Sequence, residues 1–320
     1  MNNITKNRQD KEQIIKMVER VFGENISLKD YHELSEGFCN VAYWLKLSDD
    51  RECILKISPD QAVKLMSCEV EMMQTEVKAM KLARVNHIPG VARVYGYDKS
   101  REICSGEYFI MEKLPGKSFS SIRGDMTEEE QEEVEFKIGQ CLSQLQHIKG
   151  KKFGHFCEES LQYEDWYTAF SSMLKRIIED GIAVNMQIAV PYKEVLQKLK
   201  KHKPYFEEVT EPHLVHWDSW DGNFFVKNGE ITAMIDWERA LWAEGLMEDR
   251  FRFHNKSRSF RTGYGIEQLT KSQLVRSRWY DVYLYLIMMF EGTYRHYDNN
   301  DQYNWVSTLF SAVWPEIKKF

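Results

Sequence analysis

One stretch of the chain, His216-Trp217-Asp218-Ser219-Trp220-Asp221-Gly222-Asn223, combines several polar residues, and Asp236 follows 13 positions after its last residue. It begins where an expected strand, His213–Val215, ends, and it is followed by two apolar runs, 224–226 and 231–235. An Asn-Gly pair joins these two runs, and this is the strongest short-range signal for a β-hairpin. The sequence therefore predicts a polar loop held between a strand and a hairpin.

The predicted hairpin brings two possible metal ligands together. If its turn sets the register, Asn223 faces Met234, and Asn223 and Asp236 approach each other from opposite strands. Amide and carboxylate oxygens suit Mg²⁺, which takes one or two protein ligands together with phosphate oxygens and water. Asp218 would stand just outside the metal, where it could orient an acceptor hydroxyl and take its proton. The alternative is that these Asp and Asn residues serve only turn formation.

The bulk composition limits the class of protein. A chain of 320 residues is long enough for two lobes, each with its own core. The net charge of −6 argues against a nucleic-acid partner, which would require a basic face. The six cysteines contain no CxxC pair and predict reduced thiols. The N-terminus, Met1–Asp10, is polar and does not resemble a signal peptide, and the most apolar stretch, Val282–Phe290, is too short to span a bilayer. These features predict a cytoplasmic protein. We expect a monomer or a weak dimer.

The first third of the chain alternates between strand and helix patterns. A helix is expected over 12–22 and another over 64–84. Strands are expected at Val41–Leu47, Glu52–Ile57, 90–97 and 107–114. This order is typical of a small α+β lobe with one main helix.

Leu114-Pro115-Gly116 interrupts the pattern and predicts a hinge near 112–117. It would separate an N-terminal lobe, 1–114, from a C-terminal lobe, 115–320. Beyond the hinge the pattern becomes mostly helical, and Thr127 followed by Glu130 is a capping box that opens one helix. Further helices are expected over 165–178, 192–200 and 278–294.

The pattern His216-x-Asp218-x-x-x-x-Asn223, followed by Ile235-Asp236-Trp237-Glu238, resembles the catalytic and metal-binding motifs of the aminoglycoside phosphotransferase family. That family also includes choline, homoserine and fructosamine kinases. The resemblance extends from about Tyr31 to about Tyr294. It implies a two-lobed, protein-kinase-like α+β fold, with a small N-terminal antiparallel sheet lobe and a larger, mostly helical C-terminal lobe.

The resemblance also implies roles for the motif residues. Asp218 would be the catalytic base, Asn223 and Asp236 would hold Mg²⁺, and His216 would brace the catalytic loop. In the first lobe, Lys56 would bind the α- and β-phosphates of the nucleotide.

Lys56 needs a carboxylate partner, and Glu76 fits because it lies in a row with Met72 and Met80 on the following helix. Glu69 and Glu71 are alternatives on the same helix. Gly37 lies in a turn-like segment that could cover the phosphates through backbone N–H groups, or could be an ordinary turn.

The strand that enters the hinge would hold the base of the nucleotide. The backbone of Glu112 to Leu114 could hydrogen-bond the purine, although an apolar run of this kind also fits a simple buried strand. ATP is favoured as phosphate donor, and GTP remains open.

Three departures separate the chain from protein kinases. It has no G-x-G-x-x-G, Trp217 stands where protein kinases carry an arginine, and Asp236-Trp237-Glu238 replaces D-F-G. Without that arginine, activation by loop phosphorylation lacks its usual receiver. Trp220 and Asp221 also differ from the histidine and proline more often found in the family. These differences favour a small-molecule kinase that needs no activation.

The acceptor is less well defined. The carboxylates that could meet the ammonium groups of an aminoglycoside are Asp221, Glu238, Glu244 and Asp249. They could equally be solvated or paired with neighbouring arginines. The favoured function is Mg²⁺-dependent transfer of a γ-phosphate to a hydroxyl of an aminoglycoside-like antibiotic, an activity of antibiotic resistance. The alternatives are a metabolic kinase of the choline, homoserine or fructosamine type, and a nucleotide-binding pseudokinase.

Overall fold

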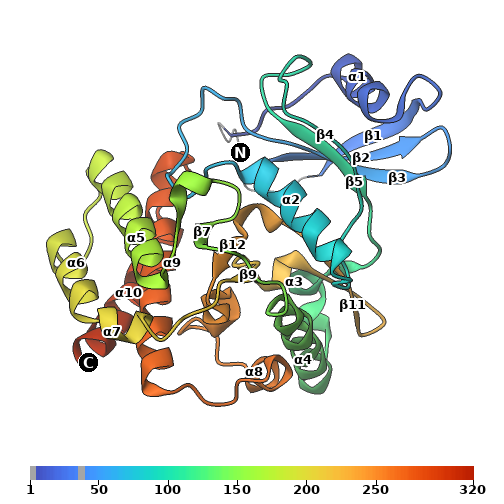
Figure 1. The fold of residues 1–320 in the computed structure, drawn as a ribbon. Coiled ribbons are helices and arrows are strands. Elements are labelled where there is room, and N and C mark those ends of the chain that lie inside the picture. The colour runs from blue at the N-terminus through green and yellow to red at the C-terminus, as the bar shows by residue number, and fades with distance from the viewer. Residues whose placement is uncertain (1–4, 35–39) are drawn as a thin grey trace.

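The computed structural model describes residues 5–34 and 40–320 and contains a sheet-based lobe and a mostly helical lobe (Figure 1). The first lobe has a five-stranded antiparallel sheet with the strand order β1-β2-β3-β5-β4. Its strands are β1 (Leu28–Leu34), β2 (Val41–Leu47), β3 (Glu52–Ile57), β4 (Val94–Asp98) and β5 (Tyr108–Glu112).

A helix packs on each face of this sheet because its central strands are buried on both sides. α1 (Lys11–Phe22) packs with one face, in a core that includes Ile110 of β5. α2 (Met72–Val85) belongs to the other core, together with the neighbouring residues Phe109 and Met111. Successive side chains of a strand point to opposite faces, so β5 serves both cores.

The second lobe contains most of the helices. They are α3 (Phe119–Ile122), α4 (Glu128–Leu145), α5 (Trp166–Ala183), α6 (Tyr192–Lys201), α7 (Lys203–Phe206), α8 (Arg258–Tyr264), α9 (Lys271–Tyr294) and α10 (Asp301–Lys318). α9 is buried along most of its length, and α5 and α10 pack beside it (Figure 1). Among the described residues, no helix combines the length and the apolar character that crossing a bilayer requires.

Short strands form two small sheets that carry the catalytic loop. One has the order β11-β10-β6 and the other the order β8-β7-β12-β9. Their bounds are β6 (Lys117–Ser118), β7 (Phe153–His155), β8 (Gln162–Tyr163), β9 (His213–Val215), β10 (Phe224–Lys227), β11 (Glu230–Met234) and β12 (Leu241–Ala243). The loop of interest therefore joins two different sheets, because β9 belongs to one and β10 to the other.

The expected fold class is confirmed, and several elements match the sequence prediction. β2, β3 and β9 have the predicted bounds, and the capping box of Thr127 and Glu130 opens α4. The predicted start of the second helix was wrong: α2 begins at Met72 rather than near position 64. The preceding segment instead forms turns, with the Glu69 side chain accepting a hydrogen bond from the Met66 N–H at 2.8 Å.

β1, α8 and α10 were not predicted from the sequence, nor were the short elements α3, α7, β6, β7, β8 and β12. β1 is an edge strand whose exposure does not alternate between successive residues, so it lacks the period-two pattern of a half-buried strand. α8 has only seven residues, too few to establish a helical period.

The linker and the first lobe both form hydrogen bonds with the hairpin of the second lobe. The Thr232 hydroxyl donates to the Pro115 carbonyl at 2.5 Å, and the Met234 N–H donates to the Gly90 carbonyl at 2.7 Å. Gly116 has a φ of +113°, a conformation that L side chains rarely adopt. We propose that the boundary between the lobes lies here, at 114/115.

Gly116→Ala is expected to lower the free energy of unfolding by roughly 1–3 kcal/mol. A Cβ at this position would lie 2.6 Å from Thr232 Oγ1 and 2.9 Å from the Val226 carbonyl oxygen, in addition to the strained φ. Urea denaturation of the wild type and of Gly116→Ala measures this loss of free energy. Gly124→Ala is the matched control, because a Cβ there meets nothing within 4 Å. An equal loss in both variants would contradict the steric explanation.

Candidate active site

Asp218 and Asn223 lie in direct contact on the loop between β9 and β10. The Asn223 side-chain amide donates to the backbone carbonyl of Asp218 at 2.8 Å and to its carboxylate at 3.1 Å. A 3₁₀ turn, Asp221–Asn223, brings the chain back so that this contact can form. The amide nitrogen is therefore directed at Asp218, and the oxygen Oδ1 is the atom left for another partner.

The hairpin has the predicted turn but not the predicted pairing of Asn223. Phe224, not Asn223, faces Met234, because an irregularity between Phe225 and Val226 shifts the register. The Asn223 carbonyl instead accepts a hydrogen bond from the Ile235 N–H at 3.0 Å. Asp236 follows directly, so the hairpin still brings Asn223 near Asp236, the second expected metal ligand.

Lys56 connects the two lobes at this site. Its ammonium group lies 2.7 and 2.9 Å from the two carboxylate oxygens of Glu76 and also contacts the carboxylate of Asp236. Burial opposes the charge of Lys56, but the carboxylates of Asp236 and Glu76 outweigh it and raise the pKa of Lys56. Burial acts against the charge of Asp236 too, yet Lys56 lowers the pKa of that carboxyl.

The other two glutamates considered as partners of Lys56 have different surroundings. Glu69 is buried and pairs with Arg295 at 2.5 Å, and Glu71 is an exposed residue at the N-cap of α2. Lys56, Glu76, Asp218, Asn223 and Asp236 are thus brought to one place from four separate segments of the chain.

The environment of Asp218 suits a group that takes up a proton near neutral pH. Burial raises the pKa of Asp218 to about 7, and the negative charges of Asp236, Asp249 and Glu238 act in the same direction. The guanidinium of Arg239 acts in the opposite direction. A carboxyl group with a pKa near the working pH is well matched to general base catalysis.

His216 and Glu248 lie on the buried side of the loop between β9 and β10. His216 Nε2 lies 2.9 Å from the Ile235 carbonyl oxygen, and burial lowers the pKa of His216 to about 4, so the ring is neutral at pH 7. The Glu248 carboxylate accepts hydrogen bonds from the backbone N–H groups of His216 at 2.9 Å and of Trp217 at 3.1 Å. Trp217 has a φ of +66°, an uncommon conformation for a bulky residue. We infer that Glu248 keeps the loop in this conformation; the sequence gives no signal for it, because Glu248 is 30 residues from Asp218 along the chain.

Glu248→Ala is expected to reduce the free energy of unfolding by roughly 2–5 kcal/mol and to lower kcat, because two buried N–H groups lose their acceptor. Glu248→Gln retains one oxygen and should lose less than half as much. Thermal unfolding and the rate of nucleotide-dependent transfer test both variants. If both retain wild-type stability, Glu248 does not hold the loop.

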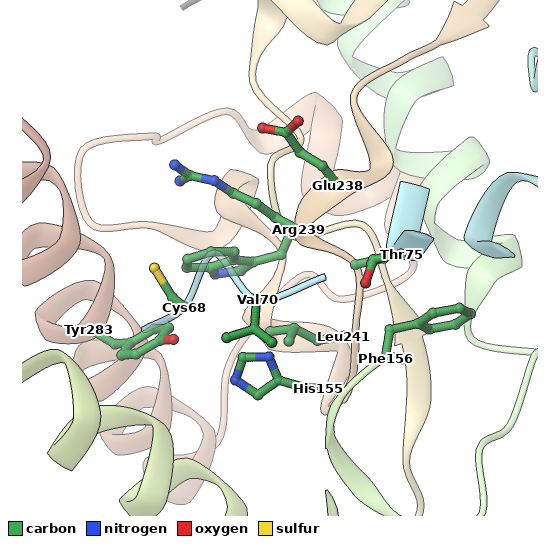
Figure 2. A pocket seen from close by; sticks show the side chains of 11 residues that line it. Cys68, Val70, Thr75, His155, Phe156, Glu238, Arg239, Leu241 and Tyr283 are labelled. Carbon is green, nitrogen blue, oxygen red and sulfur yellow. The ribbon is translucent and has the colours of Figure 1, made fainter. Parts of the chain in front are cut away.

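Arg239 was also not anticipated from the sequence. Its guanidinium pairs with Glu291 of α9 at 3.1 Å and lies 5.5 Å from the ring centroid of Trp217. Arg239 and Glu238 line a small pocket of about 10 Å³, which is room for about one water molecule, and Figure 2 shows the two side chains near each other there. Because Glu291 lies in the last turn of α9, its ion pair with Arg239 anchors the segment after Asp236 to that helix. Glu291 also pairs with Arg295.

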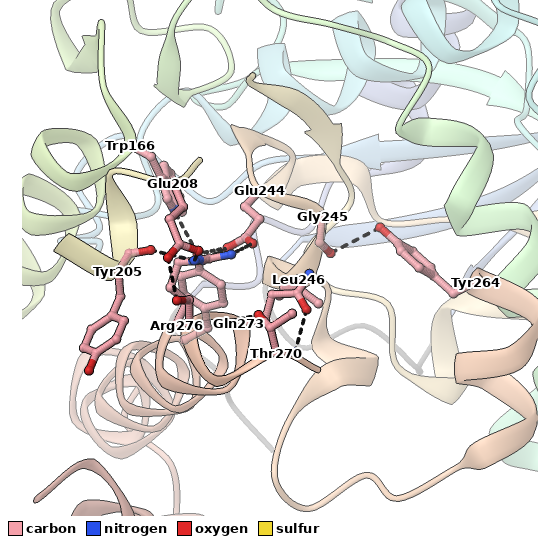
Figure 3. Close-up of polar contacts among 12 residues, drawn as sticks. Trp166, Tyr205, Glu208, Glu244, Gly245, Leu246, Tyr264, Thr270, Gln273 and Arg276 are labelled. Carbon is pink, nitrogen blue, oxygen red and sulfur yellow. Dashed lines mark hydrogen bonds and ion pairs between the residues drawn. The ribbon is translucent and has the colours of Figure 1, made fainter. Parts of the chain in front are cut away.

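The predicted acceptor carboxylates do not gather at one site. Glu244 lies between Arg276, at 2.7 and 2.8 Å, and the hydroxyl of Tyr280, a contact network shown in part in Figure 3. Glu238 accepts a hydrogen bond from the Asn40 side chain at 2.6 Å, so it faces the first lobe. Asp221 pairs with Arg123 at 2.5 Å and with Arg250 at 2.6 Å.

Asp249 and Asp221 line a cavity of about 910 Å³ on the second lobe. Burial raises the pKa of Asp249, while the nearby positive charges of Arg250 and Arg252 act against this shift. Neither Glu238 nor Glu244 lines this cavity.

Of the residues expected to contact the nucleotide through their backbone, the structure describes Glu112 and Leu114. Gly37 lies outside the described residues. The Glu112 N–H is already engaged by the Arg93 carbonyl at 2.8 Å, so Leu114 is the better candidate of the two for a backbone contact to a purine. Among the described residues, no group of three or more His, Cys, Asp and Glu side chains could hold a metal ion.

A two-lobed, protein-kinase-like fold that carries these residues between its lobes defines a phosphotransferase. The model of the phosphotransferase enzyme family matches residues 30–247, more than half of the chain, and the protein belongs to that family. The expectation of a small-molecule kinase is confirmed at this level. No curated protein sequence matches the chain.

Solved structures share the fold at low sequence identity. One is a thermostable mutant of aminoglycoside phosphotransferase APH(4)-Ia in ternary complex with AMP-PNP and hygromycin B, with 21% identity, a TM-score of 0.66, and coverage of 94% of this chain and 97% of that chain. Another is a candidate fructosamine-3-kinase from Thermobifida fusca YX-ER1, with 15% identity, a TM-score of 0.66, and coverage of 94% and 98%. A third is the complex of gentamicin with APH(2")-IIa, with 14% identity, a TM-score of 0.61, and coverage of 98% and 97%.

Proposed function

We propose that the protein transfers the γ-phosphate of a nucleoside triphosphate, with ATP favoured, to a hydroxyl of a small molecule in a Mg²⁺-dependent reaction. The observation that carries this proposal is the meeting of Lys56, Glu76 and Asp236 beside the Asp218–Asn223 pair. A cation for phosphates, oxygen ligands for a metal and a carboxylate base are the parts that phosphoryl transfer requires. AMP-PNP and ADP in similar structures support a nucleotide donor.

The donor atoms fit Mg²⁺. The Asp236 carboxylate and the Asn223 amide oxygen would hold the ion, and both are the hard oxygen ligands that Mg²⁺ prefers. The fit rests on the orientation of the Asn223 amide, whose nitrogen is committed to Asp218. When bound, Mg²⁺ would neutralise charge that develops on the phosphate oxygens.

The side chains of the protein supply the other roles. Lys56, held by Glu76, would bind the phosphates, and the backbone near Leu114 would receive the base within the lobe 1–114. Asp218 would accept the proton of the attacking hydroxyl, which the lobe 115–320 would present. His216 would hold the loop through its contact with the Ile235 carbonyl.

The identity of the acceptor is a finer question. Hygromycin B and gentamicin in similar structures support an aminoglycoside, which the sequence favoured. The similarity to the candidate fructosamine-3-kinase supports a metabolic alcohol as the acceptor to the same degree, because it too is a similarity of fold.

A panel of aminoglycosides, macrolides, choline, homoserine and sugars, scored for ADP or GDP release with Mg²⁺, tests the proposed function. We expect release that depends on one acceptor class and disappears when Mg²⁺ is chelated. Nucleotide binding without release for any acceptor would instead favour the pseudokinase alternative. Transfer of labelled phosphate to added proteins and to no small molecule would contradict the proposal.

A further inference from the structure

The cavity of about 910 Å³ adjoins the catalytic loop and is large enough for a drug-sized molecule. Trp220 and Asp221, two and three residues after Asp218, form part of its wall. Asp249 lines it as well, whereas Asp218 itself does not. A molecule in this cavity would therefore lie against the loop that carries the expected base, at Trp220 and Asp221.

The charged groups of the cavity largely neutralise one another. Arg123 pairs with both Asp221 and Glu135 at 2.5 Å, and Arg250 pairs with Asp221 at 2.6 Å. The remaining charged lining residues are three carboxylates and two cations: Glu128, Glu132, Asp249, Lys256 and Arg258. With five carboxylates against four cations among the Asp, Glu, Lys and Arg residues of the lining, the cavity carries one net negative charge, which attracts the several ammonium groups of a polycation only weakly.

Two tryptophans give the cavity exposed apolar surface. Trp220 is 43% exposed and Trp305 is 52% exposed, and both line the cavity. The Trp220 ring lies so close to Gly222 that a Cβ there would come within 2.2 Å of it, so the glycine backbone supports the ring. His254 packs against the edge of Trp305, with the ring centroids 6.2 Å apart. These rings are already positioned to receive a flat partner.

We propose that the acceptor is a ring-containing alcohol with an apolar face and at most one positive charge, which stacks on Trp305 and Trp220 and directs one hydroxyl toward Asp218. This inference rests on the proposed function and narrows its acceptor class. Asp249, which also lines the cavity, would receive the single cationic group if the acceptor carries one. A polycationic aminoglycoside is thereby disfavoured.

Isothermal titration of the full chain with Mg²⁺ and AMP-PNP tests the inference without depending on catalysis. The probes are erythromycin and p-nitrophenyl glucoside against kanamycin and hygromycin B. We expect erythromycin or p-nitrophenyl glucoside to bind more tightly than both aminoglycosides. The Kd of the tighter of these two probes should change less than about twofold up to 0.5 M NaCl. Trp305→Ala should weaken that probe about tenfold.

Ile182→Ala is the matched control, since Ile182 is 55% exposed on α5 and does not line the cavity. It should leave the Kd unchanged. Tighter binding of kanamycin or hygromycin B, binding of neither ring-containing probe, or a Trp305→Ala variant with wild-type affinity would overturn the inference. Those results would leave the proposed function intact if an aminoglycoside still released ADP, whereas the absence of ADP release with every acceptor would count against the proposed function itself.

Discussion

Asp218→Asn is expected to lower kcat by about 10²- to 10⁴-fold, the usual contribution of a positioned general base. Asparagine has nearly the same shape and can still accept the hydrogen bond from Asn223, so the loop should keep its geometry. It cannot take the proton of the attacking hydroxyl. The measurement is acceptor-dependent ADP release by the two variants at saturating Mg²⁺ and ATP.

The affinity for AMP-PNP provides the control for Asp218→Asn. Because Asp218 lies on the acceptor side of the expected metal site, nucleotide binding should change by less than about twofold while turnover falls. A variant that retains turnover within a factor of a few of the wild type would exclude Asp218 as the base. Loss of AMP-PNP binding together with turnover would instead point to a collapsed loop.

Asp236→Ala is expected to reduce phosphoryl transfer by about 10³-fold or more, because it removes a proposed ligand of Mg²⁺ and several kcal/mol of charge stabilisation with it. The fold should survive, since the Asp236 side chain is 35% exposed and Lys56 retains Glu76 as partner. Rates measured over a wide range of Mg²⁺ concentration, together with the thermal unfolding temperature, check both statements.

Asp125→Ala is a matched control for Asp236→Ala, because Asp125 is exposed on the short turn before α4 and does not line the large cavity. It should have wild-type rates. Activity of Asp236→Ala that stays near wild type and still depends on Mg²⁺ would mean that the metal is held elsewhere, and the hairpin would lose its proposed role.

The sequence could not predict which of four carboxylates would be available to an acceptor. Asp221, Glu238, Glu244 and Asp249 are all acidic and all close to the motif in sequence, so nothing in the sequence separates them. In the structure, Glu244 is enclosed by Arg276 and Tyr280, and Glu238 turns toward Asn40. Only Asp221 and Asp249 line the large cavity, and Asp221 is already paired with two arginines.

Local patterns alone predicted the main elements and the division into an α+β lobe and a mostly helical lobe, whereas the kinase-like fold class came from the family resemblance of the motif. The alternation in β2 and β3, the capping box of α4 and the Asn-Gly turn each depend on a few neighbouring residues, so a single sequence records them. The spacing from Asp218 to Asn223 was readable for the same reason. Where the pattern was weak the prediction was incomplete or wrong: the edge strand β1 was missed, and the start of α2 was placed too early.

Only the tertiary structure decided which distant groups meet. Glu248 reaches the backbone of His216 and Trp217, Arg239 reaches Glu291, and Trp305 of α10 shares a cavity with Trp220. The physical reason is that these contacts depend on the packing of helices and sheets far apart in the chain. The sequence of His216–Asn223 and Asp236 indicated the chemistry that we propose for this protein, and the packing around these residues decides which groups contact them and which carboxylates line the large cavity.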